Sequence, residues 1–213
     1  MSLISHSQNR TESLADPLAL LRLEAASRSF PPRGTVRCIG QPLFRSRAAR
    51  DLACLLDLDL GVVSWTCLPF MMDDEGGQHV PDFAVTRPNG ITLHDVDEGV
   101  STALPDWITD AAHDRGYQYE RVPAGELREG FRLENARDLL RYAGFRAPLG
   151  DRVRLLALID EYGPMPLAHC MQVVRTGTDP IAVIAALVLR RFLEIDLDEA
   201  RIGPDTRVAR FRG

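Results

Sequence analysis

The feature that most constrains the fold is a pair of strand-like runs joined by a tight turn. Val80 to Thr86 and Ile91 to Asp97 are rich in β-branched residues, and Pro88-Asn89-Gly90 between them is typical of a turn. A third run, Val62 to Met72, precedes them, and the glycines in Asp73 to Gly77 indicate another hairpin-like turn. Three consecutive strands linked by tight turns predict a sheet in this part of the chain.

Helical patterns surround these strands. Asp16 before Pro17 is a good N-cap, and it predicts a short helix to about Ser27. Ser46 caps a second predicted helix, which runs to about Leu58 with leucines at helical spacing. Further elements are predicted over Pro105 to Arg115 (helix), Tyr117 to Val122 (strand) and Glu134 to Ala143 (helix, with Gly144 at C′). The order predicts an α/β fold, with a mixed sheet flanked by helices.

The pattern changes after Gly144 to Gly150, which we interpret as a linker. Beyond it, three predicted helices are followed by two short strands, the order of a winged helix. The helices cover Asp151 to Tyr162, Pro166 to Arg175, and Pro180 to Phe192 after the N-cap Asp179; the strands cover Leu193 to Leu197 and Thr206 to Phe211. The sequence thus predicts an N-terminal helix and leader (1–34), a mixed-sheet domain (35–147) and a winged-helix domain (148–213).

The charge of the chain limits the partners it can have. The net charge is −5, and all 25 basic residues are arginine, so a mechanism that needs a lysine is excluded within this chain. An acidic protein lacks the overall electrostatic footprint of a strong DNA binder. Local arginine patches can still hold phosphate, so contact with DNA is allowed.

Other features of the composition indicate the compartment. No apolar run approaches the roughly 18 residues of a membrane span, and the polar first ten residues lack a signal-peptide core. We therefore expect a cytoplasmic protein without a membrane partner. The four cysteines form no CxxC pair, which argues against a disulfide framework and a structural zinc site.

Three aspartates form the candidate site. Asp82 lies near the start of one predicted strand, and Asp95 and Asp97 lie on the next strand, thirteen residues further on. Alternation puts Asp95 and Asp97 on one face, and normal hairpin pairing would bring Asp82 beside them. Carboxylates gathered in this way suit a magnesium ion, which prefers oxygen ligands.

Simpler interpretations stay open for these and neighbouring groups. Asp95 and Asp97 could form an exposed acidic edge that discourages strand pairing. The acids from Asp73 to Glu75 fit a solvated turn, and His94 and Glu98 should point away from Asp95. His79 is either a surface histidine or a group that supports Asp82.

The layout resembles that of the PD-(D/E)xK nucleases, and especially the TnsA family. Phe44 to Asp51, the leucine run after it and Val62-Val63-Ser64 are similar to the family's S-x-L-E-R-D helix, leucine run and D-x-x-V-V-S. Val80 to Val85 is similar to its T-P-D-F-x-V strand. The C-terminal region resembles the winged helix of many TnsA-like proteins, so the resemblance covers roughly residues 35–211.

The resemblance implies a restriction-endonuclease-like fold, a DNA partner, and magnesium bound by Asp82 and Asp95, with Asp97 as a further catalytic position. Two family groups are missing: the helix glutamate falls on Ala49, and the lysine falls on Asp97. An aspartate there brings the wrong charge to the place where phosphate charge develops. We therefore expect a degenerate, inactive nuclease-fold protein that acts as a DNA-associated or protein-docking module.

Two other functions remain open. One is an active magnesium-dependent DNA endonuclease that uses Asp82, Asp95 and Asp97; the other is a structural subunit of a nuclease or transposase-like complex. In the winged helix, Ile181 to Leu189 is nearly all apolar, which favours a protein partner over sequence-specific DNA recognition. Arginines on the last strand could still contact phosphates: Arg207, Arg210 and Arg212.

Overall fold

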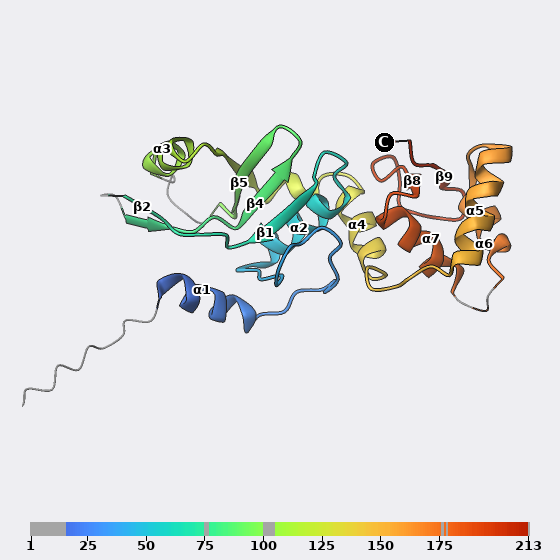
Figure 1. Ribbon diagram of the computed structural model, residues 1–213, viewed down its shortest axis with the longest axis horizontal. Helices are drawn as coiled ribbons and strands as arrows, with labels where there is room; N and C mark the ends of the chain where they lie inside the picture. The colour runs from blue at the N-terminus through green and yellow to red at the C-terminus, as the bar shows by residue number, and fades with distance from the viewer. Residues whose placement is uncertain (1–15, 75–76, 100–104, 176, 178, 213) are drawn as a thin grey trace, which may run out of the picture.

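The computed structural model describes residues 16–74, 77–99, 105–175, 177 and 179–212. The predicted leader up to residue 15, and residues 75 and 76 of the predicted turn, lie outside these ranges. The molecule is elongated, with a sheet-containing region at one end of its long axis and a mainly helical C-terminal region at the other (Figure 1).

A mixed four-stranded sheet forms the centre of the first region. Its strand order is β1-β4-β5-β6, with β1 at Ser64–Cys67, β4 at Phe83–Arg87, β5 at Gly90–Asp97 and β6 at Gln118–Pro123. β4 pairs antiparallel with β1 and β5, whereas β6 pairs parallel with β5 through the helical crossover. The predicted α/β class, a mixed sheet flanked by helices, is confirmed.

The first predicted strand was wrong in its extent. Val62 to Met72 does not form one strand: β1 ends at Cys67 because Leu68 adopts a φ of 45° and Pro69 follows. The chain then starts a separate hairpin, in which β2 (Met72–Asp74) pairs with β3 (Gly77–His79). After this hairpin, β4 begins at Phe83, three residues later than the predicted start at Val80.

Helices cover both faces of the sheet. α1 (Pro17–Ala26) and α2 (Arg47–Leu58) begin at the predicted caps, where Asp16 Oδ1 accepts from Leu18 N (3.1 Å) and Ser46 Oγ from Ala49 N (3.1 Å). α2 packs with the side of the sheet that carries Trp65 and Phe83. On the other side, α3 (Trp107–Asp114) packs with Leu93.

A short 3-10 helix η1 (Glu126–Arg128) and the helix α4 (Arg132–Leu140) complete the first region. Because α4 ends at Leu140, Gly144 does not occupy the predicted C′ position. The linker therefore begins a few residues earlier than predicted and ends where α5 begins at Leu149.

The C-terminal region contains three helices and a small antiparallel sheet. The helices are α5 (Leu149–Tyr162), α6 (Leu167–Val173) and α7 (Pro180–Leu189), and the strands are β7 (Met165–Pro166), β8 (Leu193–Ile195) and β9 (Arg207–Arg210), in the order β7-β9-β8. β7 was not predicted, since two residues carry no periodicity. α7 ends before Phe192 because Arg191 turns the chain with a φ of 57°.

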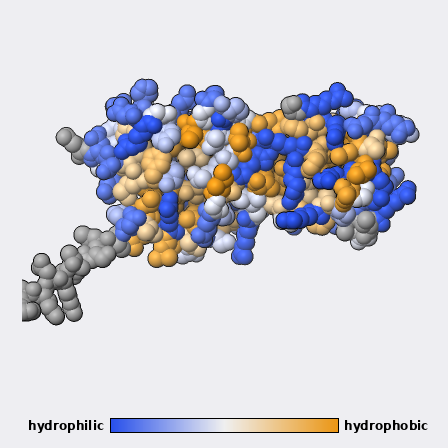
Figure 2. Space-filling view, in the orientation of Figure 1, coloured by the Kyte–Doolittle hydropathy of each residue, from blue (hydrophilic) through white to orange (hydrophobic). Residues whose placement is uncertain are grey.

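The two regions share part of their hydrophobic core. α4 packs against α7, and one cluster of buried side chains extends from α2 and α4 into the C-terminal region. On the face shown in Figure 2, hydrophobic residues lie in patches among hydrophilic ones. In the described part of the chain, no helix is both long enough and apolar enough to cross a membrane.

Candidate functional site

Asp82 and Asp95 lie together at the start of the β4–β5 pair. The register places Phe83 opposite His94, so the preceding Asp82 lies opposite Asp95. Asp82 N donates to Asp95 Oδ1 (3.0 Å), and Val96 N donates to Asp82 Oδ2 (3.0 Å). Both side chains are buried. The antiparallel pairing thus brings two of the three predicted site residues into one place.

An arginine that the sequence did not indicate bridges these two carboxylates. Arg45 lies just before α2, and its Nε donates to Asp82 Oδ1 (2.8 Å) while its Nη2 donates to Asp95 Oδ1 (2.9 Å). Arg28 donates to the carbonyl oxygen of Arg45 and so helps to fix the backbone there. A cation of the protein itself therefore lies between the two aspartates.

The other oxygen of Asp95 is also fully engaged. Tyr119 Oη from β6 donates to Asp95 Oδ2 (2.7 Å), and His79 Nε2 from β3 lies 2.6 Å from the same oxygen. Both oxygens of Asp82 and both oxygens of Asp95 therefore have hydrogen-bond donors. We refer to Arg45, His79, Asp82, Asp95 and Tyr119 as the Arg45 cluster.

The electrostatics of the Arg45 cluster differ between its two acids. Burial raises the pKa of Asp82, and Arg45 and the Val96 N–H do not fully offset it. Burial also raises the pKa of Asp95, but His79, Tyr119 and Arg45 outweigh it, so that the pKa is lowered. For Arg45, burial lowers the pKa and the two carboxylates outweigh it, so the net shift is upward. The guanidinium thus stays charged between the acids.

Asp97, the third predicted site residue, makes its contacts elsewhere. Its Oδ1 pairs with Arg121 Nη2 of β6 (2.9 Å) and accepts from Gly99 N (2.8 Å). Ala49, where the resemblance would place a glutamate, is buried in the α2 side of the core. The structure therefore joins Asp82 and Asp95 through Arg45, and ties Asp97 to a different arginine.

Some groups near the three aspartates belong to the site and others do not. His79 is part of the Arg45 cluster, so its description as a surface histidine was wrong. His94 is buried, with Nδ1 3.7 Å from Glu120 Oε2, as expected for a side chain that points away from Asp95. Asp73 is exposed and lies 3.5 Å from Arg115 Nη2, which fits a solvated hairpin.

Sequence reasoning missed Arg45 and Tyr119. Tyr119 lies on the predicted strand Tyr117 to Val122. This strand pairs parallel with the strand of Asp95, so its polar side chains were candidates for the site. Arg45 gave only a weak signal, since it precedes the helix N-cap and no periodicity applies to it. Its position next to the predicted catalytic helix was the available hint.

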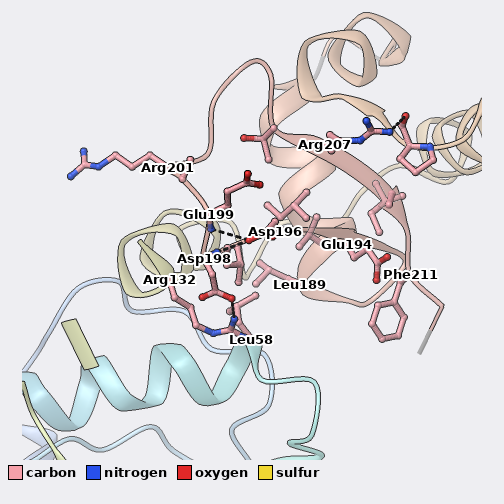
Figure 3. A pocket seen from close by; sticks show the side chains of 18 of the residues that line it. Leu58, Arg132, Leu189, Glu194, Asp196, Asp198, Glu199, Arg201, Arg207 and Phe211 are labelled. Carbon is pink, nitrogen blue, oxygen red and sulfur yellow. Dashed lines mark hydrogen bonds and ion pairs between the residues drawn. The ribbon is translucent and has the colours of Figure 1, made fainter. Parts of the chain in front are cut away.

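A hollow of about 830 Å³ lies apart from the Arg45 cluster, where the two regions meet. Figure 3 shows apolar side chains, including Leu58 and Leu189, among charged ones in the lining. Some of these groups pair with their own neighbours: Arg132 Nη1 binds Asp198 Oδ2 (2.7 Å), and Asp196 Oδ1 accepts from Asp198 N (2.7 Å). The hollow thus has no uniform charge that would select a ligand.

Neither a scan against protein-family models nor a search of curated proteins found a match to this chain.

Proposed function

We propose that this chain is a degenerate TnsA-like nuclease-fold protein that does not cut DNA and acts as a DNA-associated or protein-docking module. The single observation that carries the proposal is Arg45, which bridges Asp82 and Asp95 where a nuclease of this type would bind its metal ion. The TnsA resemblance and the α/β fold, with its mixed sheet between helices, support the restriction-endonuclease-like assignment.

The Arg45 cluster does not fit a magnesium ion as it is arranged. Magnesium needs free carboxylate oxygens at about 2.0–2.1 Å, whereas the oxygens of Asp82 and Asp95 already accept hydrogen bonds. The guanidinium also supplies the positive charge that an ion would bring. Binding an ion would require Arg45 to leave and two buried acids to be paired again, so we derive no reaction step through a metal.

The predicted winged helix supports the docking part of the proposal. The order α5-β7-α6-α7-β8-β9, with the sheet order β7-β9-β8, is the arrangement expected of that fold. Its third helix, α7, is buried over eight consecutive residues, Ala182 to Leu189. A helix so enclosed has no polar face for reading base edges, which favours contacts with protein or with the DNA backbone.

A cleavage assay tests the missing catalysis. Supercoiled plasmid is incubated with the purified chain and magnesium or manganese, with the Asp82→Asn variant as the matched control. We expect both proteins to leave the plasmid intact, because loss of one electrostatic group typically costs about 10²–10³ in rate and two family groups are missing here. Cutting by the unmodified chain that Asp82→Asn abolishes would instead establish the endonuclease that uses Asp82, Asp95 and Asp97.

A binding assay tests the association with DNA. Fluorescence anisotropy of a labelled duplex should show salt-dependent binding that does not depend on sequence. Absence of binding at low salt would reject the DNA-associated module and leave protein docking as the remaining role. The cleavage and binding results are independent, so each half of the proposal stands or falls separately.

A further inference from the structure

A second buried carboxylate lies outside the Arg45 cluster. Asp51 in the first turns of α2 is only 1% exposed, and three arginines from three elements converge on it. Arg47 Nε of α2 lies 3.3 Å from Oδ1, Arg137 Nη2 of α4 lies 2.5 Å from Oδ1, and Arg128 Nη2 of η1 lies 3.9 Å from Oδ2. We call Arg47, Arg128 and Arg137 the arginine triad.

The arginine triad carries more charge than Asp51 can neutralise. Three guanidinium groups around one carboxylate leave a local charge of +2, although one arginine would be enough to pair a buried acid. The side chains of Arg47, Arg128 and Arg137 are 45%, 59% and 28% exposed, so part of each guanidinium faces solvent. Within the described ranges, Arg47 and Arg128 have no ion pair apart from Asp51.

A donor at the same place lacks an acceptor. Arg137 Nε is buried without a hydrogen-bond partner among the described residues. Each guanidinium has five N–H donors, and the one carboxylate cannot accept from all of them. Donors in this number suit an oxyanion with several acceptor oxygens, and planar guanidinium groups bind phosphate oxygens in pairs.

We propose that the arginine triad is a phosphate-binding site and that its ligand is the phosphodiester backbone of DNA. The choice of backbone follows from the exposure of Arg47 and Arg128, because a small ligand needs an enclosed pocket whereas a polymer can lie across an open surface. Phosphate contacts of this kind position a duplex without reading its sequence. The proposal rests on the DNA association proposed above and locates it.

Substitution of the two exposed members tests the proposal in the full chain. Arg47→Ala/Arg128→Ala should lower duplex affinity by about tenfold or more, and should reduce the slope of log K against log salt by about 2, one for each lost phosphate contact. The loss should be the same for duplexes of different sequence. The double variant Arg115→Ala/Arg201→Ala provides the matched control for loss of two charges, because both are exposed arginines that pair with an acid other than Asp51.

Thermal unfolding of each variant checks that the fold is retained. Arg128→Lys adds a second test, because it keeps the charge but loses paired hydrogen bonding; its affinity should lie between those of the unmodified chain and Arg128→Ala. If the double variant binds duplex as tightly as a variant that lacks both control arginines, the triad is not the site. In that case DNA association stands and only this inference fails.

The source of the phosphate is tested separately with inorganic phosphate. Protection of the unmodified chain against thermal unfolding by millimolar phosphate, absent in Arg47→Ala/Arg128→Ala, would support a phosphate site in the triad. If that protection occurs while duplex affinity is unchanged by the double substitution, the ligand is a free phosphate compound and the DNA assignment is overturned. Absence of any duplex binding would reject both this inference and the DNA association.

Discussion

The two regions of the molecule bury different kinds of side chain. Among the described residues, eight polar or charged ones are buried: six lie between Arg50 and Asp95 in the sheet-containing region, and only Asp151 lies in the C-terminal region. In that region, by contrast, α7 buries eight consecutive apolar residues. Burial of charge is costly unless each group is paired, so the difference indicates where the chain holds a specific polar arrangement and where packing alone suffices.

This difference is consistent with the separate roles that we propose for the two regions. The sheet-containing region holds the Arg45 cluster and the arginine triad, each built around buried carboxylates. The C-terminal region contributes a core shared with α2 and α4. Disruption of either region should therefore lower stability, but by different physical causes and with different dependence on pH.

The largest loss of stability is expected from the apolar core of α7. Ile184→Ala should lower the free energy of unfolding by about 2–5 kcal/mol, because it removes buried methyl groups and leaves a cavity. Ile181→Ala in the same helix is the matched control, since Ile181 is 43% exposed and Ile184 is 3% exposed. Urea denaturation measures both changes. Equal losses for the two variants would contradict the packing of α7 described here.

A comparable but pH-dependent loss is expected in the Arg45 cluster. Arg45→Ala leaves two buried carboxylates without their cation and should cost about 3 kcal/mol near pH 7. Arg201→Ala, which breaks an exposed ion pair with Glu134, should cost at most about 1 kcal/mol. Urea denaturation at several pH values distinguishes this loss, which depends on pH, from the loss in the apolar core of α7.

The sign of the pH dependence follows from the acids. Burial already raises the pKa of Asp82, and removal of Arg45 raises it further. A group whose folded-state pKa is raised stabilises the fold below its unfolded pKa, and this contribution is lost as the pH rises through the folded pKa. The deficit of Arg45→Ala should therefore be largest near pH 7 and should shrink toward about pH 4. The loss of unfolding free energy caused by Ile184→Ala should not change with pH. If the losses caused by Ile184→Ala and Arg45→Ala changed with pH in the same way, the proposed difference between the two regions would be wrong.

The smallest effect is expected where the two regions are tied together. Arg191 Nη2 donates to the carbonyl oxygens of Asp59 (2.9 Å) and Val62 (3.0 Å), which follow α2. Arg191→Ala should cost about 1–2 kcal/mol through these lost hydrogen bonds. Arg191→Gly loses the same bonds but relieves the φ of 57°, so it should be less destabilising by about 0.4–1 kcal/mol. If Arg191→Gly were less stable than Arg191→Ala, the positive φ of Arg191 would not be a source of strain.

Much of the fold could be predicted because its signals are local. The caps at Asp16 and Ser46 and the β4–β5 hairpin were found correctly, since a cap or a turn depends on a few consecutive residues. The pairing of Asp82 with Asp95 followed from that hairpin. The break at Leu68 was missed because a run of β-favouring residues does not reveal a change in backbone direction.

The rest of the site could not be predicted because it depends on segments distant in sequence. Arg45 reaches Asp95 across fifty residues, and Tyr119 reaches it across twenty-four. No period or motif in the sequence specifies which segment of the chain lies over the end of a hairpin. The role of His79 stayed open for the same reason, since the turn at Asp73 to Gly77 was predicted but the side chain that its hairpin brings to Asp95 was not.

Titration calorimetry of manganese into the purified chain shows whether Arg45 takes the place of a metal ion between Asp82 and Asp95. We expect no saturable binding by the unmodified chain. We expect Arg45→Ala to gain a site, because Asp82, Asp95 and His79 would then lack the guanidinium between them. Binding of one ion by the unmodified chain, with the heat lost in Asp82→Asn, would show that Arg45 does not replace a metal ion.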